Sequence, residues 1–318
     1  MRIVFMGTPD FAVPSLKLLL EQQYNVVAVV TQPDRPKGRK KTLTPPPVKE
    51  AALSLGLPVL QPEMMRSEDA VAAIAELKPD LIVTAAYGQI LPKALLAIPR
   101  LGCINVHGSL LPQYRGGAPI QRSIMNGEAE TGVTIMYMAE GLDTGDMISV
   151  VKLPITDEDT SGSMFEKLSL AGAELLGATL PSIIAGEAKA VPQQNELATY
   201  APNLTREDER IDWTEPARAI FNQVRGLSPM AGAFTFLNGE VFKVWHCAVP
   251  EAINAKPATA APGTVIAADS NGIHVQTGAG VLVLKEIQPA GKRAMSAADW
   301  LQGARLEAGT LLGDGGAA

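Results

Sequence analysis

Two side chains able to take part in chemistry, Asn105 and His107, lie in the segment INVHGSLLPQYRGGAP, residues 104–119. An apolar run precedes them and glycines and prolines follow, which is typical of a buried strand that ends in a loop. Because successive strand residues point to opposite faces, Asn105 and His107 share one face. Polar groups in that position need hydrogen-bond partners or a catalytic role. A core histidine bonded to its neighbouring asparagine would fit the same pattern.

A second segment, EGLDTGD, places glycine-flanked carboxylates directly after the apolar run 131–138. Asp143 is the better candidate, since turn capping explains Asp146 equally well. An Asn, a His and an Asp in one crevice suit acyl transfer to an amine. The Asn amide or an imidazolium can donate hydrogen bonds to an oxyanion, and a His–Asp pair can hold and pass a proton. No Ser or Cys nucleophile is evidently paired with His107, which favours direct transfer between two bound substrates.

The elements that must position these residues alternate in type. Amphipathic spacing predicts helices over 13–22 and 163–186. Apolar runs predict strands over 2–6, 26–31, 80–86, 102–107 and 131–138. This order predicts an α/β fold with a Rossmann-like, doubly wound, mostly parallel sheet. Ligands of such sheets bind at the carboxyl ends of the strands. The turn after the first strand, GTPDFA, lacks the G-x-G-x-x-G pattern, and no P-loop is present, which disfavours a nicotinamide dehydrogenase.

The composition changes after residue 188. We expect a first domain over 1–188, a linker over 189–206, a second domain over 207–312 and a disordered tail over 313–318. The second domain begins with a helix over 216–227 and continues with a hairpin around Asn238-Gly239, strands over 272–278 and 280–288 and a short helix over 295–301. These short strands favour a small C-terminal β-barrel of the OB type, with a sandwich as the alternative.

Composition limits the function classes. The chain has 318 residues, 47% of them hydrophobic, and a net charge of -6, which argues against indiscriminate nucleic-acid binding and permits a local basic patch. With two Cys and three His, buried free thiols are favoured over a disulfide, and a dedicated metal site is not expected. No apolar run reaches the roughly 20 residues that a membrane span requires, so we expect a cytoplasmic protein without a membrane partner.

The stretch INVHGSLLPQYRGGAPIQ resembles the folate-dependent formyltransferases, which carry Asn-x-His followed by Ser-Leu-Leu-Pro. TGVTIMYM followed by GLDTGDM is similar to the region that carries their catalytic aspartate. The resemblance implies that 10-formyltetrahydrofolate is the formyl donor. It implies a catalytic role for Asn105, His107 and Asp143, and a folate site lined by Ser109, Leu110, Leu111 and Pro112.

Further segments resemble the methionyl-tRNA branch of that family, over about residues 2–303: FMGTPDFAVPSL, TQPDRPKGRKK, YAPNLTREDERIDW and PAGKRAMSAADWL. This implies Met-charged initiator tRNA as the formyl acceptor and a role in translation initiation. The oligomeric state is open, with a monomer as the default expectation. A sugar-nucleotide N-formyltransferase using the same donor is the main alternative. A formyl-folate hydrolase and a catalytically silent tRNA-binding module also remain open, although a pure binder need not keep the three polar residues.

Five positive charges fall within seven residues, and we expect Pro36 and Gly38 to keep them out of regular structure: Arg35, Lys37, Arg39, Lys40 and Lys41. A solvated, flexible loop would explain them equally well. In the resembling family this loop contacts the acceptor arm of tRNA, which predicts a salt-dependent contribution to binding. From residue 207 onward nine Lys or Arg stand against twelve Asp or Glu, so a basic face of the second domain would need clustering, as at Lys285, Lys292 and Arg293.

Overall fold

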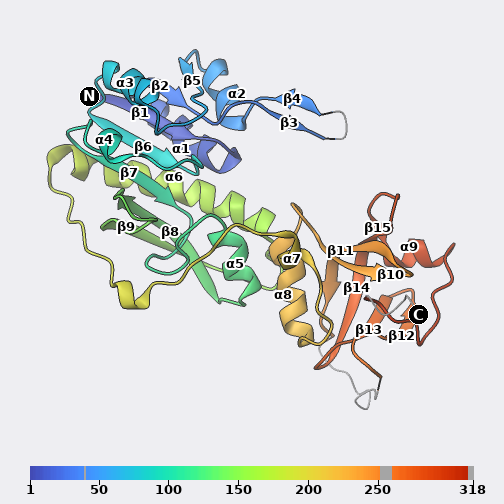
Figure 1. Ribbon diagram of the computed structural model, residues 1–318. Helices are drawn as coiled ribbons and strands as arrows, with labels where there is room; N and C mark the ends of the chain where they lie inside the picture. The colour runs from blue at the N-terminus through green and yellow to red at the C-terminus, as the bar shows by residue number, and fades with distance from the viewer. Residues whose placement is uncertain (39–40, 251–259, 314–318) are drawn as a thin grey trace. The chain divides into compact units, whose positions relative to one another are not determined.

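The computed structural model describes residues 1–38, 41–250 and 260–313 (Figure 1). The chain forms two compact units. Unit 1 comprises Met1–Pro119, Glu130–Pro154 and Phe165–Pro202, and unit 2 comprises Ile120–Ala129, Ile155–Met164 and the described part of Asn203–Ala318. The predicted tail, apart from Gly313, lies outside the described residues.

Unit 1 is built on a seven-stranded sheet in the order β5-β2-β1-β6-β7-β8-β9. Its strands are β1 (Arg2–Gly7), β2 (Asn25–Val30), β5 (Val59–Leu60), β6 (Leu81–Ala85), β7 (Cys103–His107), β8 (Glu130–Tyr137) and β9 (Met147–Pro154). The first five in this spatial order are parallel, which confirms the predicted Rossmann-like sheet. β8 and β9 are antiparallel to their neighbours, so the sheet is mostly parallel, as predicted. β8 begins beside the end of β7, so the chain between these two strands does not cross back over a face of the sheet, as a parallel connection would require.

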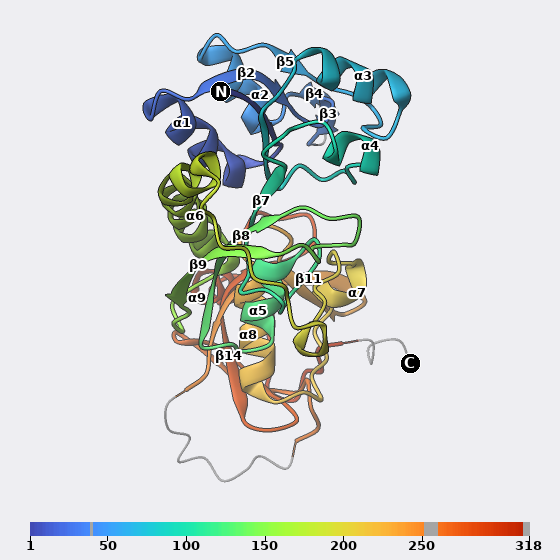
Figure 2. The same cartoon turned by 90° about the vertical axis from the view of Figure 1, so that its left-hand side faces the viewer.

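Helices cover the two faces of this sheet. On one face lie α1 (Val13–Glu21) and most of α6 (Ser161–Ala185), since Gly172 of α6 closely approaches Val106 and Val133 (Figure 2). On the other face, α3 (Glu68–Glu76) and α4 (Lys93–Leu96) pack in a cluster that includes Cys103. Because strand side chains alternate, Asn105 and His107 share the face of Cys103 and point away from α6. A further helix of unit 1, α2, spans Pro47–Ser54.

Helix α6 is long and apolar enough to cross a membrane by length and composition alone, contrary to the expectation that no such run exists. Half of its most apolar window is buried inside the protein. Leu168, Leu176 and Leu180 are fully buried, and Ser169 Oγ donates a hydrogen bond to the Phe11 carbonyl. These contacts make α6 a core helix of the folded chain, where its apolar character stabilises packing on the sheet.

Two segments differ from their predicted form. The basic segment, expected outside regular structure, pairs β3 (Arg35–Lys37) with β4 (Thr42–Thr44) as a short antiparallel hairpin (Figure 1). A pair this short tolerates proline, because one missing N–H removes little of the ladder. The expected linker is bonded to unit 1 by two isolated bridges, Met147–Val191 and Arg115–Tyr200. Its hydrogen bonds make the stretch up to Pro202 part of unit 1.

Unit 2 contains an antiparallel sheet in the order β10-β11-β14-β13-β12, with β15 paired to β14. The strands are β10 (Ala233–Leu237), β11 (Glu240–Ala248), β12 (Val265–Asp269), β13 (Gly272–Gln276), β14 (Val281–Gln288) and β15 (Met295–Ser296). The helices of this part are α5 (Pro119–Met125), α7 (Arg206–Glu209), α8 (Ala217–Leu227) and α9 (Ala297–Leu301). The predicted C-terminal antiparallel domain, its hairpin and its two flanking helices are thereby confirmed.

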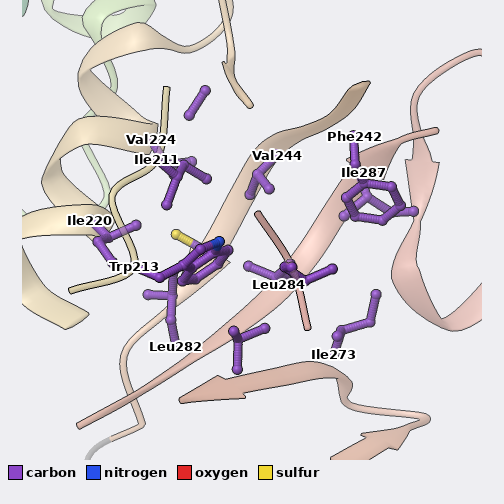
Figure 3. Packing of buried hydrophobic residues seen from close by; sticks show 14 of the residues in the cluster. Ile211, Trp213, Ile220, Val224, Phe242, Val244, Ile273, Leu282, Leu284 and Ile287 are labelled. Atoms are coloured by element: carbon purple, nitrogen blue, oxygen red, sulfur yellow. The ribbon is translucent and has the colours of Figure 1, made fainter. Parts of the chain in front are cut away.

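The core of unit 2 forms between α8 and the sheet (Figure 3). Ile220 and Val224 of α8 pack with Val244 of β11 and with Leu282 and Leu284 of β14. The buried Cys247 belongs to the same cluster, and Cys103 is buried in unit 1, so both thiols are free as predicted. Burial raises the pKa of Cys103 to about 12 and that of Cys247 further still, which keeps both groups protonated and unreactive.

Candidate active site

The end of β7 presents Asn105 on the face that α6 does not cover. Thr84 of β6 lies directly beside it in the parallel register, and its one hydroxyl hydrogen is within reach of Asn105 Oδ1, 2.9 Å from Oγ1, and of the Ile104 carbonyl, 3.0 Å from Oγ1. Because the amide oxygen is held this way, the Nδ2 group points its two N–H donors elsewhere. Within the described part of the chain Nδ2 has no protein acceptor, which leaves it available to a ligand oxygen.

His107 is held in one orientation by the loop that follows β7. Its Nε2 lies 3.1 Å from the Tyr114 carbonyl, and its side chain is only 6% exposed. A carbonyl can only accept a hydrogen bond, so Nε2 carries the hydrogen and Nδ1 has the free lone pair in the neutral ring. The arrangement leaves Nδ1 as the atom that can accept or return a proton.

Asp143 approaches that same nitrogen, with Oδ2 lying 3.8 Å from His107 Nδ1. The separation suits an ion pair with an imidazolium and is too long for a direct hydrogen bond. Oδ2 also accepts a hydrogen bond of 2.8 Å from the Gly116 N–H. Asp143 has a φ of +50°, a backbone conformation that costs a non-glycine residue roughly 1 kcal/mol and persists only where the surrounding structure imposes it. Strain of this kind is most often kept at functional sites.

The Asp143 loop reaches His107 by folding back over the sheet. Because β8 is antiparallel to β7, its end lies beside the start of β7, where Met138 N donates to the Cys103 carbonyl. The loop must therefore return the length of β7 to bring Asp143 to His107. The side chain of Asp146 is exposed, and only its carbonyl is used, to accept from Tyr137 N. Of the two aspartates, the structure places only Asp143 next to His107.

The expected folate residues Ser109–Pro112 begin the loop after β7. Ser109 Oγ donates to the Gln113 carbonyl at 2.7 Å, and Thr134 Oγ1 donates to the Ser109 carbonyl. Leu111 is buried, and Leu110 lies against Gly132 of β8, where an added Cβ would come within 2.5 Å of it. Their role in folate binding stays a prediction, to which the structure adds a rigid, internally bonded loop.

A pocket that the sequence did not reveal lies in the same unit, with a volume of about 300 Å³. It is lined by Met64, Arg66, Gln89 and Ile90, and Ile90 is 82% exposed. The last two residues follow β6, the strand beside β7, and so leave the same edge of the sheet as the loop after His107. An exposed apolar side chain beside a cation suits a ligand that has both a flat apolar ring and an anionic group.

The basic segment is described in part. Arg35 in β3 is exposed and lies 4.0 Å from Glu63, and Lys41 is exposed after the turn. Lys37 belongs to β3 by its backbone, and Arg39 and Lys40 lie outside the described residues. Figure 1 shows the hairpin extending away from the sheet of unit 1. A role in tRNA binding stays a prediction for all five.

Thr84 was not anticipated, although a hydroxyl within the otherwise apolar strand LIVTA is a signal that could have found it. We expect Thr84→Val to lower the turnover number about tenfold with little change in either KM, because Asn105 loses the bond that aims its amide. Thr84→Ser keeps the hydroxyl and should restore most of the rate. Steady-state kinetics of both purified variants provide the check, and a Val variant as fast as the parent would contradict the positioning role.

Known protein families match both parts of the chain. Residues 1–180 match the model of the family described as formyl transferase, and residues 203–305 match its C-terminal domain. The chain is 56% identical over 313 residues to the methionyl-tRNA formyltransferase of Bacillus subtilis, covering 98% of both chains. It is 54% identical over 304 residues to the enzyme of the same name from Listeria monocytogenes, covering 95% of this chain and 96% of the relative.

Solved structures share the fold at low sequence identity. The sugar 3N-formyl transferase WlaRD matches with a TM-score of 0.67 and 19% identity, over 92% of this chain and 99% of its own. HypX from Aquifex aeolicus, solved with tetrahydrofolic acid, matches with a TM-score of 0.64 and 19% identity, over 95% of this chain and 47% of its own. With both domain models matched in order and near-complete coverage of its relatives, this chain belongs to the formyl transferase family.

Proposed function

We propose that this protein transfers the formyl group of 10-formyltetrahydrofolate to the α-amino group of methionine on initiator tRNA, so that translation can begin. The observation that carries the proposal is the similarity to methionyl-tRNA formyltransferases, which extends through both units at 54–56% identity. We further propose that it works as a monomer in the cytoplasm, where charged tRNA is used.

The site geometry supports direct transfer. The amine nitrogen attacks the formyl carbon, and the carbonyl oxygen gains negative charge while the amine loses a proton. Asn105 Nδ2 supplies hydrogen-bond donors for that oxygen. His107 Nδ1 accepts the amine proton, and Asp143 stabilises the resulting imidazolium. When the bond between the formyl carbon and N10 breaks, the proton returns to the folate nitrogen, so that no covalent enzyme intermediate is required.

The pocket lined by Met64, Arg66, Gln89 and Ile90 supports the proposed donor. A reduced folate carries an aminobenzoyl ring and a glutamate tail, which match an apolar wall and a cation respectively. Because this pocket and the loop after β7 lie at the same edge of the sheet, one extended ligand can contact both. The Asp143–His107 pair would then face the formyl group.

The test is a transfer assay with labelled 10-formyltetrahydrofolate and Met-charged initiator tRNA. Uncharged initiator tRNA and a 4-amino-sugar nucleotide serve as parallel acceptors. We expect label only on the charged tRNA. Label on the sugar would instead support the sugar-nucleotide N-formyltransferase that the shared fold also allows, and free formate without acceptor labelling would indicate a folate hydrolase.

Replacing Arg39, Lys40 and Lys41 together by Ser should weaken tRNA binding and flatten its dependence on salt, since each lost phosphate contact lowers the slope of log K against log salt by about one. The KM for the folate should not change. Binding measured at several salt concentrations provides the check. A matched variant replaces three exposed lysines elsewhere in unit 1, Lys17, Lys78 and Lys189. Equal slopes in both variants would indicate that the segment is a solvated surface feature without a role in tRNA binding.

A further inference from the structure

The stretch after α6 that the sequence presents as a linker contributes a buried polar side chain to the neighbourhood of Asp143. Gln193 is 8% exposed although both of its neighbours in sequence are exposed. Its Nε2 donates to the Asp143 carbonyl at 2.8 Å and to the Gly145 carbonyl at 2.7 Å. Fifty residues separate Gln193 from Asp143, so nothing local brings the two together.

The other end of the same amide is bonded to the loop after β7. Gln193 Oε1 accepts from Arg115 Nε at 3.0 Å and from Arg115 Nη2 at 2.7 Å. Arg115 is 2% exposed, and its Nη2 also donates to Asn195 Oδ1 at 2.8 Å. An arginine has no acceptor, so the amide oxygen of Gln193 must face it and the amide nitrogen must face the two carbonyls. All four hydrogen-bonding positions of the amide are used, which fixes its orientation.

Gln193 therefore joins the loop after β7, which orients His107, to the loop that carries Asp143. Arg115 directly follows Tyr114, whose carbonyl orients His107, and directly precedes Gly116, whose N–H binds Asp143. The surrounding stretch supports the same loop, since Tyr114 N donates to Thr199 Oγ1 and Ala118 N donates to the Ala201 carbonyl. A buried network of this kind is rigid when every member is satisfied.

We propose that Gln193 is a positioning residue of the active site, which holds Asp143 in its strained conformation at His107 by joining the Asp143 loop to Arg115. The inference rests on the proposed function and deepens it. Without the two Nε2 donors, Asp143 would be free to leave a backbone conformation that a non-glycine residue disfavours. A displacement of about 1 Å at a reacting group can cost about 100-fold in rate.

The decisive variant is Gln193→Glu. Its carboxylate still accepts from Arg115, so the buried guanidinium keeps its partner, but it has no donor for the carbonyls of Asp143 and Gly145. We expect the turnover number to fall about 100-fold while the KM for each substrate changes less than about threefold. Gln194→Glu is the matched control, because Gln194 is the adjacent residue of the same type and is exposed; it should keep the parent rate.

Two readouts separate positioning from a general structural role. In an Asp143→Ala background, Gln193→Glu should cause no further loss of turnover, because the group that it positions is already gone. Independently of activity, amide hydrogen exchange at Gly116 should become faster in Gln193→Glu, while exchange at Ala118, which donates to Ala201, should not change. The exchange measurement needs no acceptor, so it can be read even if the proposed substrate is wrong.

Parent-like turnover of Gln193→Glu, a full additional loss in the Asp143→Ala background, or unchanged exchange at Gly116 would each overturn the proposal. If the parent protein itself fails to label Met-charged tRNA, the proposed function fails, and the exchange result alone then decides whether Gln193 holds the Asp143 loop.

Discussion

Replacing either member of the His107–Asp143 pair should reduce formyl transfer by about 10²–10⁴-fold, the usual contribution of a positioned general acid or base. In His107→Ala no group remains at Nδ1 to take the amine proton. In Asp143→Asn the imidazolium loses the carboxylate that lies 3.8 Å from Nδ1. Single-turnover rates with saturating donor and charged tRNA measure the chemical step directly.

Both variants should stay folded, and this distinguishes a catalytic from a structural origin of the loss. Among the described residues, the His107 side chain makes one hydrogen bond, with the Tyr114 carbonyl, and the Asp143 side chain accepts one, from the Gly116 N–H. Asp146→Asn, which changes an exposed side chain on the same loop, is the control and should keep the parent rate. A parent-like rate in either His107→Ala or Asp143→Asn would remove that residue from the mechanism.

Converting the amide of Asn105 to a carboxylate should have an effect of at least the same size. Asn105→Asp is nearly isosteric, but it exchanges the donors of Nδ2 for a negative charge where the carbonyl oxygen becomes an oxyanion. Losing one such donor costs about 10²–10³-fold, and an added like charge makes the loss larger. We expect turnover to fall at least about 10³-fold.

Comparing Asn105→Asp with Asn105→Ala separates the effect of the added charge from the effect of losing the donors. Thr84 Oγ1 can still donate to an aspartate oxygen at position 105, so the local packing is preserved and thermal unfolding should shift little. Asn105→Ala removes the donors without adding charge and should be faster than Asn105→Asp. If the two variants were equally slow, charge at this position would not matter and the oxyanion would lie elsewhere.

Strand periodicity alone was enough to place Asn105 and His107 on one face at the end of a strand, because side-chain alternation is a local property of the backbone. The spacing of apolar residues likewise predicted α1, α6, α8 and the hairpin of β10 and β11, all of which the structure contains. The motif around these residues also identified the family, since it is a contiguous run of side chains.

The approach of Asp143 to His107 was decided by the tertiary structure. The sequence predicted a glycine-flanked loop after a strand, but not that β8 runs antiparallel and that the loop must fold back along β7. Strand direction depends on where the preceding chain crosses the sheet, and no local pattern of residues encodes that crossing.

The roles of Thr84 and Gln193 could not be predicted from the sequence, for a related reason. A threonine in an apolar strand and a glutamine in a polar stretch are ordinary residues, and their importance comes from partners far away in the chain. Gln193 lies where composition indicates a linker, because polar residues and prolines are typical of one. Only the fold brings its amide to Arg115 and to the Asp143 loop. Each of these buried hydrogen bonds joins two segments that are distant in sequence, so the pattern of residues in one segment cannot predict it.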